Sequence, residues 1–410
     1  MKRLSVLIVA LLVLAAVVVP SAAQDDGEGV VVVPAGETIK LGMAVDLSNL
    51  LPAPGEDMAN AANLAVMEYN EDPFIEGFEV ELLVEDDRCA PEDATSVANL
   101  FAADPEIVGV VGHMCSGASI AASEIYVDAR IPMVSPSSTA RAFTDRGLDI
   151  TFRTAFNDGV QGLVAARFIM EVVGAENVAI LHDNSDYGLG LATVVQETLE
   201  EAGTTVSAFE VIDPEEQDYR SQLTVLAGES PDLIYFGGYQ NQAAGIVEQM
   251  QEVGLGDAIL FSADGVYTQD FLDLAGESAD GTHVTFGSGL GQDEDLDAEF
   301  DAAYEEEFGV APDELGPFHA QAYDAANVLL NAIAEVAEVD GDGNLIINRE
   351  ALIEAIGMTA GYQGVSGTVT CTENGDCGSI IIAVFAAEDG EWVEVEVPAE
   401  LQVFDPEAAE

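Results

Sequence analysis

Short apolar runs alternate along most of the chain with longer segments in which apolar residues recur at helical spacing. This alternation predicts strands of a parallel sheet that are joined by helices. In the first part of the chain, strands are expected at 39–47, 78–85, 107–111, 131–135 and 151–154, and helices at 57–69, 91–103 and after residue 116. The pattern therefore predicts a doubly wound α/β lobe.

A second alternation of the same design follows. Strands are expected at 178–182, 205–211, 233–236, 258–261 and 282–286, and helices at 159–173, 187–202, 219–226 and 241–253. Two further helices, at 297–308 and 317–337, precede a region of strands at 364–397. A chain of 410 residues is longer than one usual domain, so the pattern predicts two lobes.

Hydroxyl side chains follow two neighbouring strands of the first lobe. One strand ends in the turn G-H-M-C-S-G, in which Ser116 stands at the expected N-cap of the next helix. The next strand ends in S-P-S-S-T, which supplies Ser137 and Thr139. Ligands of open α/β sheets bind at this edge, and a helix N-terminus there favours a carboxylate. The alternative is ordinary capping and turn chemistry.

These paired turns, G-H-x-C-S and S-P-x-x-T, resemble the leucine/isoleucine/valine-binding proteins, the type I periplasmic solute receptors of branched-chain amino-acid ABC transporters. The turns H-D-N-S-D-Y-G-L-G at 182–190 and Y-F-G-G-Y at 235–239 are similar to the same family. The resemblance implies a type I periplasmic-binding-protein fold, α/β, with two doubly wound parallel-sheet lobes joined by a three-strand hinge. The crossovers are expected near Thr154, Gly287 and Val365. Such lobes close on a ligand between them.

Domain boundaries follow from these crossovers. The N-terminal lobe is expected to comprise 38–154 and 289–365, and the C-terminal lobe 155–288 and 366–400. Residues 24–37 are acidic and then rich in Val and Gly, and they are expected to form a disordered lead-in. Residues 401–410 are expected to form a tail.

An amino-acid zwitterion needs donors for its carboxylate and acceptors for its ammonium group. In the resembling family, the residues that match Ser116 and Thr139 bind these two groups, and the carbonyl that matches Ser137 accepts from the ammonium. The anionic partner is expected to be Asp264, in F-S-A-D-G-V, where the family usually has Glu. The shorter acid implies either that the ligand sits closer or that a water bridges the gap.

The side chain of the ligand needs an apolar or aromatic surface to pack against, which we call the wall of the site. Tyr187 and Tyr239 match the family's aromatic walls; the alternative for each is a tyrosine of the core or the rim. The family has a large aromatic residue before a Gly-Asp pair in the first loop, whereas this chain has Pro-Gly-Glu at 54–56. Leu50 and Leu51 are candidates for an apolar wall in its place, so the side-chain preference stays open.

Four cysteines allow three disulfide pairings. The family's bridge between the first two turns implies a Cys89–Cys115 bond, and both residues follow strands that end at one sheet edge. The Asn-Gly between Cys371 and Cys377 favours a hairpin across which these two can pair. Free thiols are the alternative, and a metal site is disfavoured because no His lies at ligand spacing.

The first 23 residues have the pattern of a signal peptide. Lys2 and Arg3 precede an apolar run at 4–19, and Ser-Ala-Ala at 21–23 supplies small residues for cleavage. The alternative is a retained membrane anchor. No later segment is long and apolar enough to cross a bilayer. The expected location is therefore the periplasm or the extracellular face of the membrane.

The chain carries 76 acidic residues against 11 Lys and Arg, a formal net charge of −65. Repulsion excludes nucleic acid as a partner. Such a surface suits high salt, where screening relieves self-repulsion. Composition bias of the lineage is the alternative.

Two other motifs point to different functions. Asp-Gly-Asp-Gly-Asn at 340–344 resembles the start of a calcium loop, but Leu345 and Ala351 stand where Gly and Glu are required. An acidic loop is the better interpretation. His113 beside Ser116 suggests a hydrolase, but the chain has no G-x-S-x-G elbow. Neither an enzyme activity nor a cofactor or metal is expected.

Together, the pattern and the resemblance imply an extracytoplasmic receptor, expected as a monomer, that captures a branched-chain or related amino acid between two closing lobes. Its expected partners are an ABC permease and the ATPase of that permease. One alternative is a ligand-sensing subunit of a signalling system. Another is a transport receptor whose cargo is an amide, urea or aromatic acid.

Overall fold

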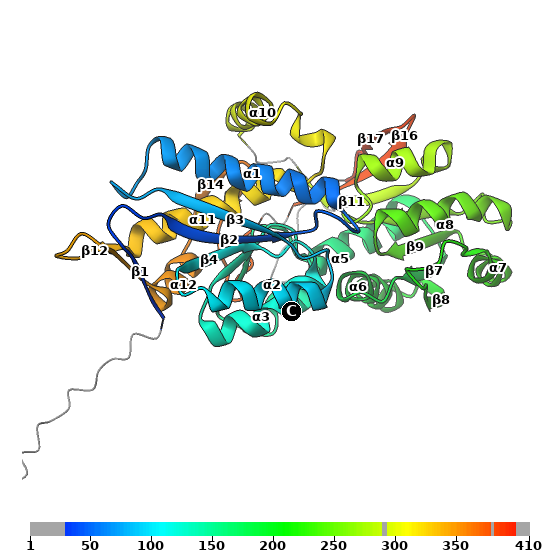
Figure 1. The fold of residues 1–410 in the computed structure, drawn as a ribbon. Coiled ribbons are helices and arrows are strands. Elements are labelled where there is room, and N and C mark those ends of the chain that lie inside the picture. Colours follow the sequence, from blue (N-terminus) through cyan, green and yellow to red (C-terminus); the bar gives the residue numbers. More distant parts are fainter. Residues whose placement is uncertain (1–28, 289–292, 379–380, 399–410) are drawn as a thin grey trace, which may run out of the picture.

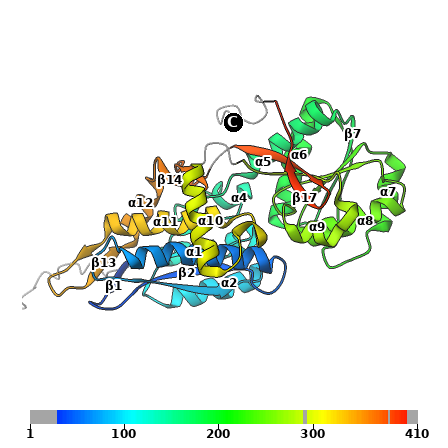
Figure 2. The same ribbon diagram turned by 90° about the horizontal axis from the view of Figure 1, so that it is seen from above.

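The computed structural model describes residues 29–288, 293–378 and 381–398. They form two lobes, which lie side by side in the view from above (Figure 2). Lobe 1 contains a parallel sheet in the order β3-β2-β4-β5-β6. Its strands are β2 (Ile39–Val45), β3 (Val80–Asp86), β4 (Ile107–Gly112), β5 (Met133–Ser135) and β6 (Thr151–Arg153).

Helices cover both faces of this sheet, which is why its central strand β4 is buried along its whole length. In Figure 1, α1 (Pro52–Glu71) and α11 (His319–Val336) lie above the sheet, and α2 (Pro91–Ala103) and α3 (Ser116–Ala129) lie below it. The other helices of this lobe are α4 (Arg141–Thr144), α10 (Glu294–Phe308), η3 (Pro312–Glu314) and α12 (Arg349–Gly357).

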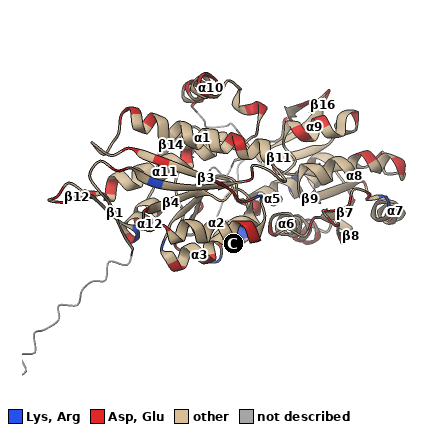
Figure 3. Ribbon diagram, viewed as in Figure 1, with Lys and Arg blue, Asp and Glu red and all other residues tan. Residues whose placement is uncertain are grey.

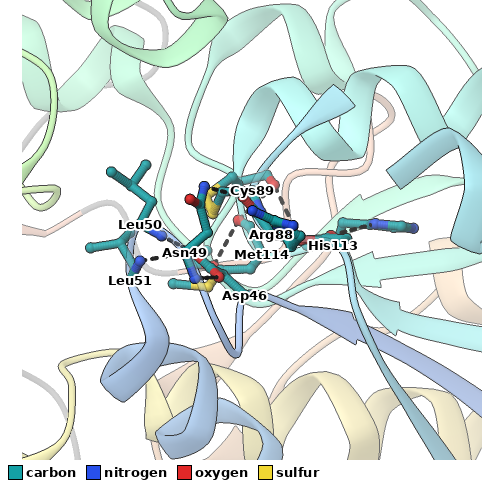
Figure 4. Close-up of a disulfide and its surroundings, with 12 residues drawn as sticks. Asp46, Asn49, Leu50, Leu51, Arg88, Cys89, His113 and Met114 are labelled. Atoms are coloured by element: carbon teal, nitrogen blue, oxygen red, sulfur yellow. Dashed lines mark hydrogen bonds and ion pairs between the residues drawn. A yellow bond between two sulfur atoms is a disulfide. The ribbon is translucent and has the colours of Figure 1, made fainter. Parts of the chain in front are cut away.

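Helix α1 begins at Pro52, five residues before the start that the apolar pattern predicts. Proline suits the first helical position because its missing N–H has no partner there in any case. The buried carboxylate of Asp46 accepts hydrogen bonds from the backbone N–H groups of residues 48–51, which fixes the preceding loop. Figure 4 shows this arrangement. The loop between β2 and α1 is therefore shorter than the predicted end of the strand at 47 and start of the helix at 57 imply.

Lobe 2 contains a seven-stranded sheet in the order β17-β16-β11-β10-β9-β7-β8. Strands β7 to β11 pair in parallel, and β16 and β17 join antiparallel. The strands are β7 (Asn177–His182), β8 (Thr205–Val211), β9 (Leu233–Gly237), β10 (Ile259–Ser262), β11 (His283–Gly287), β16 (Ile382–Glu388) and β17 (Glu391–Glu394).

The helices of lobe 2 again connect successive strands. They are α5 (Asp158–Phe168), which continues as the π-helix η1 (Ile169–Val173), then α6 (Asp186–Ala202), α7 (Arg220–Glu229), α8 (Gln240–Glu252), α9 (Gln269–Ala275) and η2 (Gly276–Ala279). The apolar pattern predicts most of these helices, but it misses the short α9 and, in lobe 1, α12.

The third crossover lies later in the chain than the sequence suggests. Ser366 donates through its backbone N–H to Asp324 of α11, at 2.8 Å, so it belongs to lobe 1. Asp376 pairs with Arg153 at the edge of β6 and accepts from its guanidinium group at 2.5 Å. This buried arginine needs a counter-charge, which holds the 371–377 turn on lobe 1. The predicted crossing near Val365 is therefore wrong; the chain crosses between this turn and β16.

A small antiparallel sheet occupies the far end of lobe 1. It has the order β1-β13-β12, with β1 (Val30–Val33), β12 (Glu338–Val339) and β13 (Leu345–Asn348). Strand β1 buries Val31 and Val33 and exposes Val30 and Val32, a half-buried strand pattern. The expectation of a disordered lead-in at 24–37 is therefore wrong for these residues. A separate hairpin joins β14 (Tyr362–Gly364) and β15 (Gly367–Val369).

Both predicted disulfides are present. Cys89 is bonded to Cys115, and Cys371 to Cys377. Figure 4 shows the first bond beside the loop that Asp46 holds and beside Met114. This bond joins the turns that follow β3 and β4, so it fixes two neighbouring strand ends of lobe 1 to each other.

Acidic residues are spread over both lobes, and basic residues are few (Figure 3). No helix within the described ranges is long and apolar enough to span a membrane. The predicted signal peptide at 1–23 and the tail at 401–410 lie outside the described residues.

Candidate ligand-binding site

A cavity of about 40 Å³ lies between the carboxyl ends of the two sets of parallel strands. Lobe 1 contributes the turns after β4 and β5, and lobe 2 contributes those after β7, β9 and β10. The lining consists of Leu51, Pro54, Met114, Cys115, Ser116, Ser137, Tyr187, Tyr239, Asp264, Gly265, Thr268, Pro317 and Phe318. Five of the six predicted ligand residues are in this lining, and the sixth, Thr139, is buried behind it.

The hydroxyl groups of lobe 1 connect the two predicted turns. Ser116 is the first residue of α3 rather than its N-cap, which is Cys115. Its Oγ accepts a hydrogen bond from the backbone N–H of Ala140 at 3.2 Å. Ser137 donates through its hydroxyl to the carbonyl of Met114 at 2.9 Å. The N-cap prediction for Ser116 is therefore wrong, because its side chain bonds the neighbouring turn instead of its own helix.

Two tyrosines and an acid face these turns from lobe 2. Tyr187 donates through its hydroxyl to Asp264 Oδ1 at 2.9 Å, and accepts from the backbone N–H of Gly265 at 3.0 Å. The rings of Tyr187 and Tyr239 lie 5.2 Å apart between centroids, at an angle of 39°. Both tyrosines are buried. The two aromatic turns of lobe 2 thus form one continuous wall, and Asp264 lies at its edge.

Asp158, at the start of α5, is a second buried carboxyl beside Asp264. Neither of its side-chain oxygens has a well-formed hydrogen bond, although the hydroxyl of Thr139 lies next to it. Burial, and then the charge of Asp264, raises the pKa of Asp158 well above its usual range. Burial also raises the pKa of Asp264, to about 6. Two neighbouring carboxyl groups away from water ionise less readily, and a positive charge placed beside them would favour their ionised forms.

Sequence reasoning missed Asp158 because an acid in the first turn of a helix is ordinary helix-dipole chemistry. The pattern gave no signal that α5 starts beneath the ligand cavity. Only the interaction of Asp158, the first residue of α5, with Asp264 after β10 reveals it.

The apolar part of the lining comes mostly from lobe 1. Leu51 and Pro54 belong to the loop that leads into α1 and to its first turn, and Met114 follows β4. Phe318, directly before α11, completes this wall. Of the two predicted leucines, Leu51 lines the cavity and Leu50 does not.

Comparison with known proteins decides the family. The family described as "Periplasmic binding protein" matches residues 38–379. A leucine-, isoleucine-, valine-, threonine- and alanine-binding protein of Pseudomonas aeruginosa is 30% identical over 351 residues, which cover 86% of this chain and 90% of that protein. The chain belongs to the Leu/Ile/Val-binding family of periplasmic binding proteins. Members of this family are substrate-binding proteins of ABC transporters and not enzymes.

Solved structures of the Leu/Ile/Val-binding family confirm the type I fold. A leucine-binding protein from Thermotoga maritima superposes with a TM-score of 0.78 and 26% identity, covering 88% of this chain and 98% of that chain. A branched-chain amino-acid binding protein from Streptococcus pneumoniae, solved in complex with isoleucine, gives a TM-score of 0.75 at 26% identity, covering 88% and 100%.

His113, in the turn that leads to Ser116, is held by structural partners. His113 Nδ1 lies 2.7 Å from Asp87 Oδ2, and its Nε2 lies 3.0 Å from the hydroxyl of Tyr126. Its side chain is fully buried and does not contact Ser116, whose Oγ bonds Ala140. The Ser–His pairing that a hydrolase requires is therefore absent here.

The acidic turn at 340–344 is closed by its own hydrogen bonds. Asp340 accepts from the backbone N–H groups of Asp342 and Asn344, at 2.8 and 2.9 Å. Among the residues that the structure describes, no three His, Cys, Asp or Glu side chains are grouped to hold a metal ion.

Proposed function

We propose that this protein captures an amino acid with an aliphatic side chain in the cavity between its lobes. The single observation that carries the proposal is the buried carboxyl of Asp264, which lines the cavity together with Ser116 and Ser137 and has the buried carboxyl of Asp158 next to it. The acids suit an α-ammonium group. The first turn of α3, with its free backbone N–H groups, suits the α-carboxylate.

The apolar wall supports an aliphatic side chain. Leu51, Met114 and Phe318 present hydrocarbon surface to the cavity, and the tyrosine pair supplies flat faces opposite. A neutral amide, urea or aromatic acid is a weaker candidate for the cargo. Such a ligand would leave both carboxyl groups without a cationic partner in a buried site.

The proposed role follows from that of the family. The loaded receptor, with its lobes closed on the ligand, docks on a membrane permease whose ATPase drives transport, and lobe opening releases the amino acid. The pattern of residues 1–23 supports export to the periplasm or the extracellular face, and the protein is proposed to act there as a monomer.

Calorimetric titration with three matched ligands tests the proposal. L-Leucine carries both charged groups, leucinamide lacks the carboxylate, and 4-methylpentanoate lacks the ammonium group. We expect L-leucine, L-isoleucine or L-valine to bind best and 4-methylpentanoate to bind at least about a hundredfold more weakly, since a buried charge would lose its partner. Equal affinity for leucine and 4-methylpentanoate would refute the assignment of the acids to an ammonium group.

A further inference from the structure

A second cavity, of about 290 Å³, lies at the hinge beside the ligand cavity. Its lining comes from both lobes: α10 and α11 on one side, and β11, β16 and β17 on the other. Pro317 belongs to the linings of both cavities. The volume is close to the lower limit for small-molecule sites in proteins. The cavity is therefore large enough for a ligand of a few heavy atoms.

Aromatic rings form the lobe 2 side of this hinge cavity. The ring of Tyr267 lies 4.9 Å from that of Phe286 and 4.6 Å from that of Phe385, between centroids. All three residues are in the lining. Aromatic faces attract cations through their quadrupole, most strongly where water is excluded.

Carboxylates surround these rings. Asp297 and Asp313 enter the lining from lobe 1 and Glu394 from lobe 2, and the lining contains neither Lys nor Arg. Burial, followed by the charges of Asp313 and Glu394, raises the pKa of Tyr267 to about 12. The two carboxylates therefore act on the same ring from opposite lobes.

His319 is the one basic side chain in the lining, and it already has acidic partners. Its Nδ1 lies 3.0 Å from the carbonyl of Gly316 and 3.3 Å from Asp57 Oδ2. Its Nε2 lies 3.8 Å from Asp313 Oδ1. A proton on His319 is thus balanced by Asp57 and Asp313, which leaves Asp297 and Glu394 available to a ligand.

Gln321 supplies an independent indication of a ligand. This lining residue is only 9% exposed, and its side-chain oxygen is buried without a hydrogen-bond partner among the described residues. Its main-chain carbonyl accepts from the hydroxyl of Thr154 at 2.8 Å, which ties the backbone of α11 to the first crossover. A buried acceptor without a donor is costly, and an N–H group of a ligand would remove that cost.

We propose that the hinge cavity binds a small organic cation with N–H donors, an alkylammonium or guanidinium ion. The rings of Tyr267 and Phe286 would contact its apolar or delocalised part, and Glu394, Asp297 and Gln321 would accept from its N–H groups. Because the walls belong to both lobes, the cation binds best at one lobe angle. Its binding is therefore coupled to that of the ligand between the lobes, with equal effect in both directions.

Titration calorimetry with ethylammonium chloride tests this site, with sodium chloride added to keep the ionic strength constant. We expect saturable binding to the wild type, and weaker binding of tetramethylammonium, which has no N–H donor. Gln321→Met and Glu394→Gln should each weaken ethylammonium binding about tenfold, the effect of one lost charge-assisted hydrogen bond. Glu391→Gln is the matched control, since Glu391 lies on the same strand outside the lining and should bind as the wild type does.

Ethylammonium also suits the acids of the ligand cavity, so the titration is repeated in Asp264→Asn. Binding that persists in this variant and is weakened there by Gln321→Met or Glu394→Gln belongs to the hinge cavity, whatever the outcome for amino acids. The proposal is overturned if the wild type shows no saturable heat, if binding disappears in Asp264→Asn, or if Glu391→Gln weakens binding as much as Glu394→Gln does.

Discussion

Gly188 and Gly237 are packed backbone against backbone at the start of α6 and the end of β9. A β-carbon on Gly188 would lie 2.4 Å from the carbonyl oxygen of Gly237, and one on Gly237 would lie 2.2 Å from that of Gly188. Each glycine is the neighbour of a turn that carries a wall tyrosine, Tyr187 or Tyr239. The close approach therefore sets the distance between the two tyrosine rings.

Gly188→Ala should therefore destabilise the protein by about 1–3 kcal/mol and weaken ligand binding, because the added carbon must separate α6 from β9. Gly190→Ala, two residues later in the same helix, is the matched control, since its β-carbon would meet no atom within 4 Å. It should be neutral or stabilising by up to about 1 kcal/mol. Chemical denaturation and ligand titration of both variants check this. Similar losses in the two would show that glycine flexibility, not close packing, matters there.

Asp264→Asn should weaken amino-acid binding by roughly two to three decades. The reason is that breaking one side of a buried charge pair costs about 3–5 kcal/mol. Calorimetric titration with the best amino acid measures the loss, and circular dichroism should be unchanged. Asp257→Asn, at an exposed position of the same lobe, is the control and should keep full affinity. An affinity of Asp264→Asn within threefold of the wild type would place the ammonium group elsewhere.

Affinity for an amino acid should fall as the pH is lowered below about 6. Burial raises the pKa of Asp264 to about 6 in the ligand-free fold, whereas an ammonium ligand needs this group ionised. Binding therefore releases a proton at acidic pH, and the dissociation constant should rise up to about tenfold per pH unit below this pKa. Titrations at pH 8, 7, 6 and 5 measure the profile. A dissociation constant that is equal at pH 7 and pH 5 would contradict it.

The raised pKa of Asp264 affects the stability of the fold in the opposite direction to its effect on ligand affinity. A carboxyl group whose pKa is higher in the folded state stabilises the fold fully below its unfolded pKa, and this contribution is lost as the pH rises through 6. Ligand affinity and ligand-free stability should therefore respond to acidification in opposite directions, as far as this group is concerned.

Loss of the Cys89–Cys115 bond should weaken ligand binding more than loss of the Cys371–Cys377 bond. The first closes a 26-residue separation and holds the turn that carries Ser116; the second closes a separation of six. In a chain-entropy model, the first bond contributes about 3.5 kcal/mol to stability and the second about 2 kcal/mol. Cys89→Ser and Cys371→Ser are compared by thermal melting and ligand titration. An unchanged dissociation constant in Cys89→Ser would count against a role of the bond in shaping the site.

The melting temperature should rise between 0.1 and 3 M sodium chloride. The described Lys and Arg residues are few and already contact acidic groups or carbonyls, as in Lys40 with Glu106 and Arg349 with the carbonyl of Ile107. Most acids in the described part of the chain therefore have no basic partner. Screening shortens the range of their repulsion from about 10 Å at 0.1 M to about 3 Å at 1 M salt. Potassium chloride should act equally, because screening depends on ionic strength. A flat profile would argue for composition bias without adaptation to salt.

The sequence by itself determined the strands of the two parallel sheets and most helices, and its resemblance to the family added the Cys89–Cys115 pairing. Helix α2 has the predicted bounds, 91–103, since local periodicity and a leading proline specify it. The predicted site residues also converge. Ser116, Ser137, Tyr187, Tyr239 and Asp264 all follow parallel strands, and the carboxyl ends of such strands necessarily share one edge of a sheet. Information of this kind is local, so a pattern along the chain can carry it.

Tertiary structure alone decided which distant groups meet. The third crossover lies after Asp376 because Arg153, more than two hundred residues earlier, binds that carboxylate. Asp158 becomes a candidate for the site only because the start of α5 is buried against the turn of Asp264. Burial and charge coupling are properties of two assembled lobes. No local pattern encodes them, because each depends on residues that the chain brings together only when it folds.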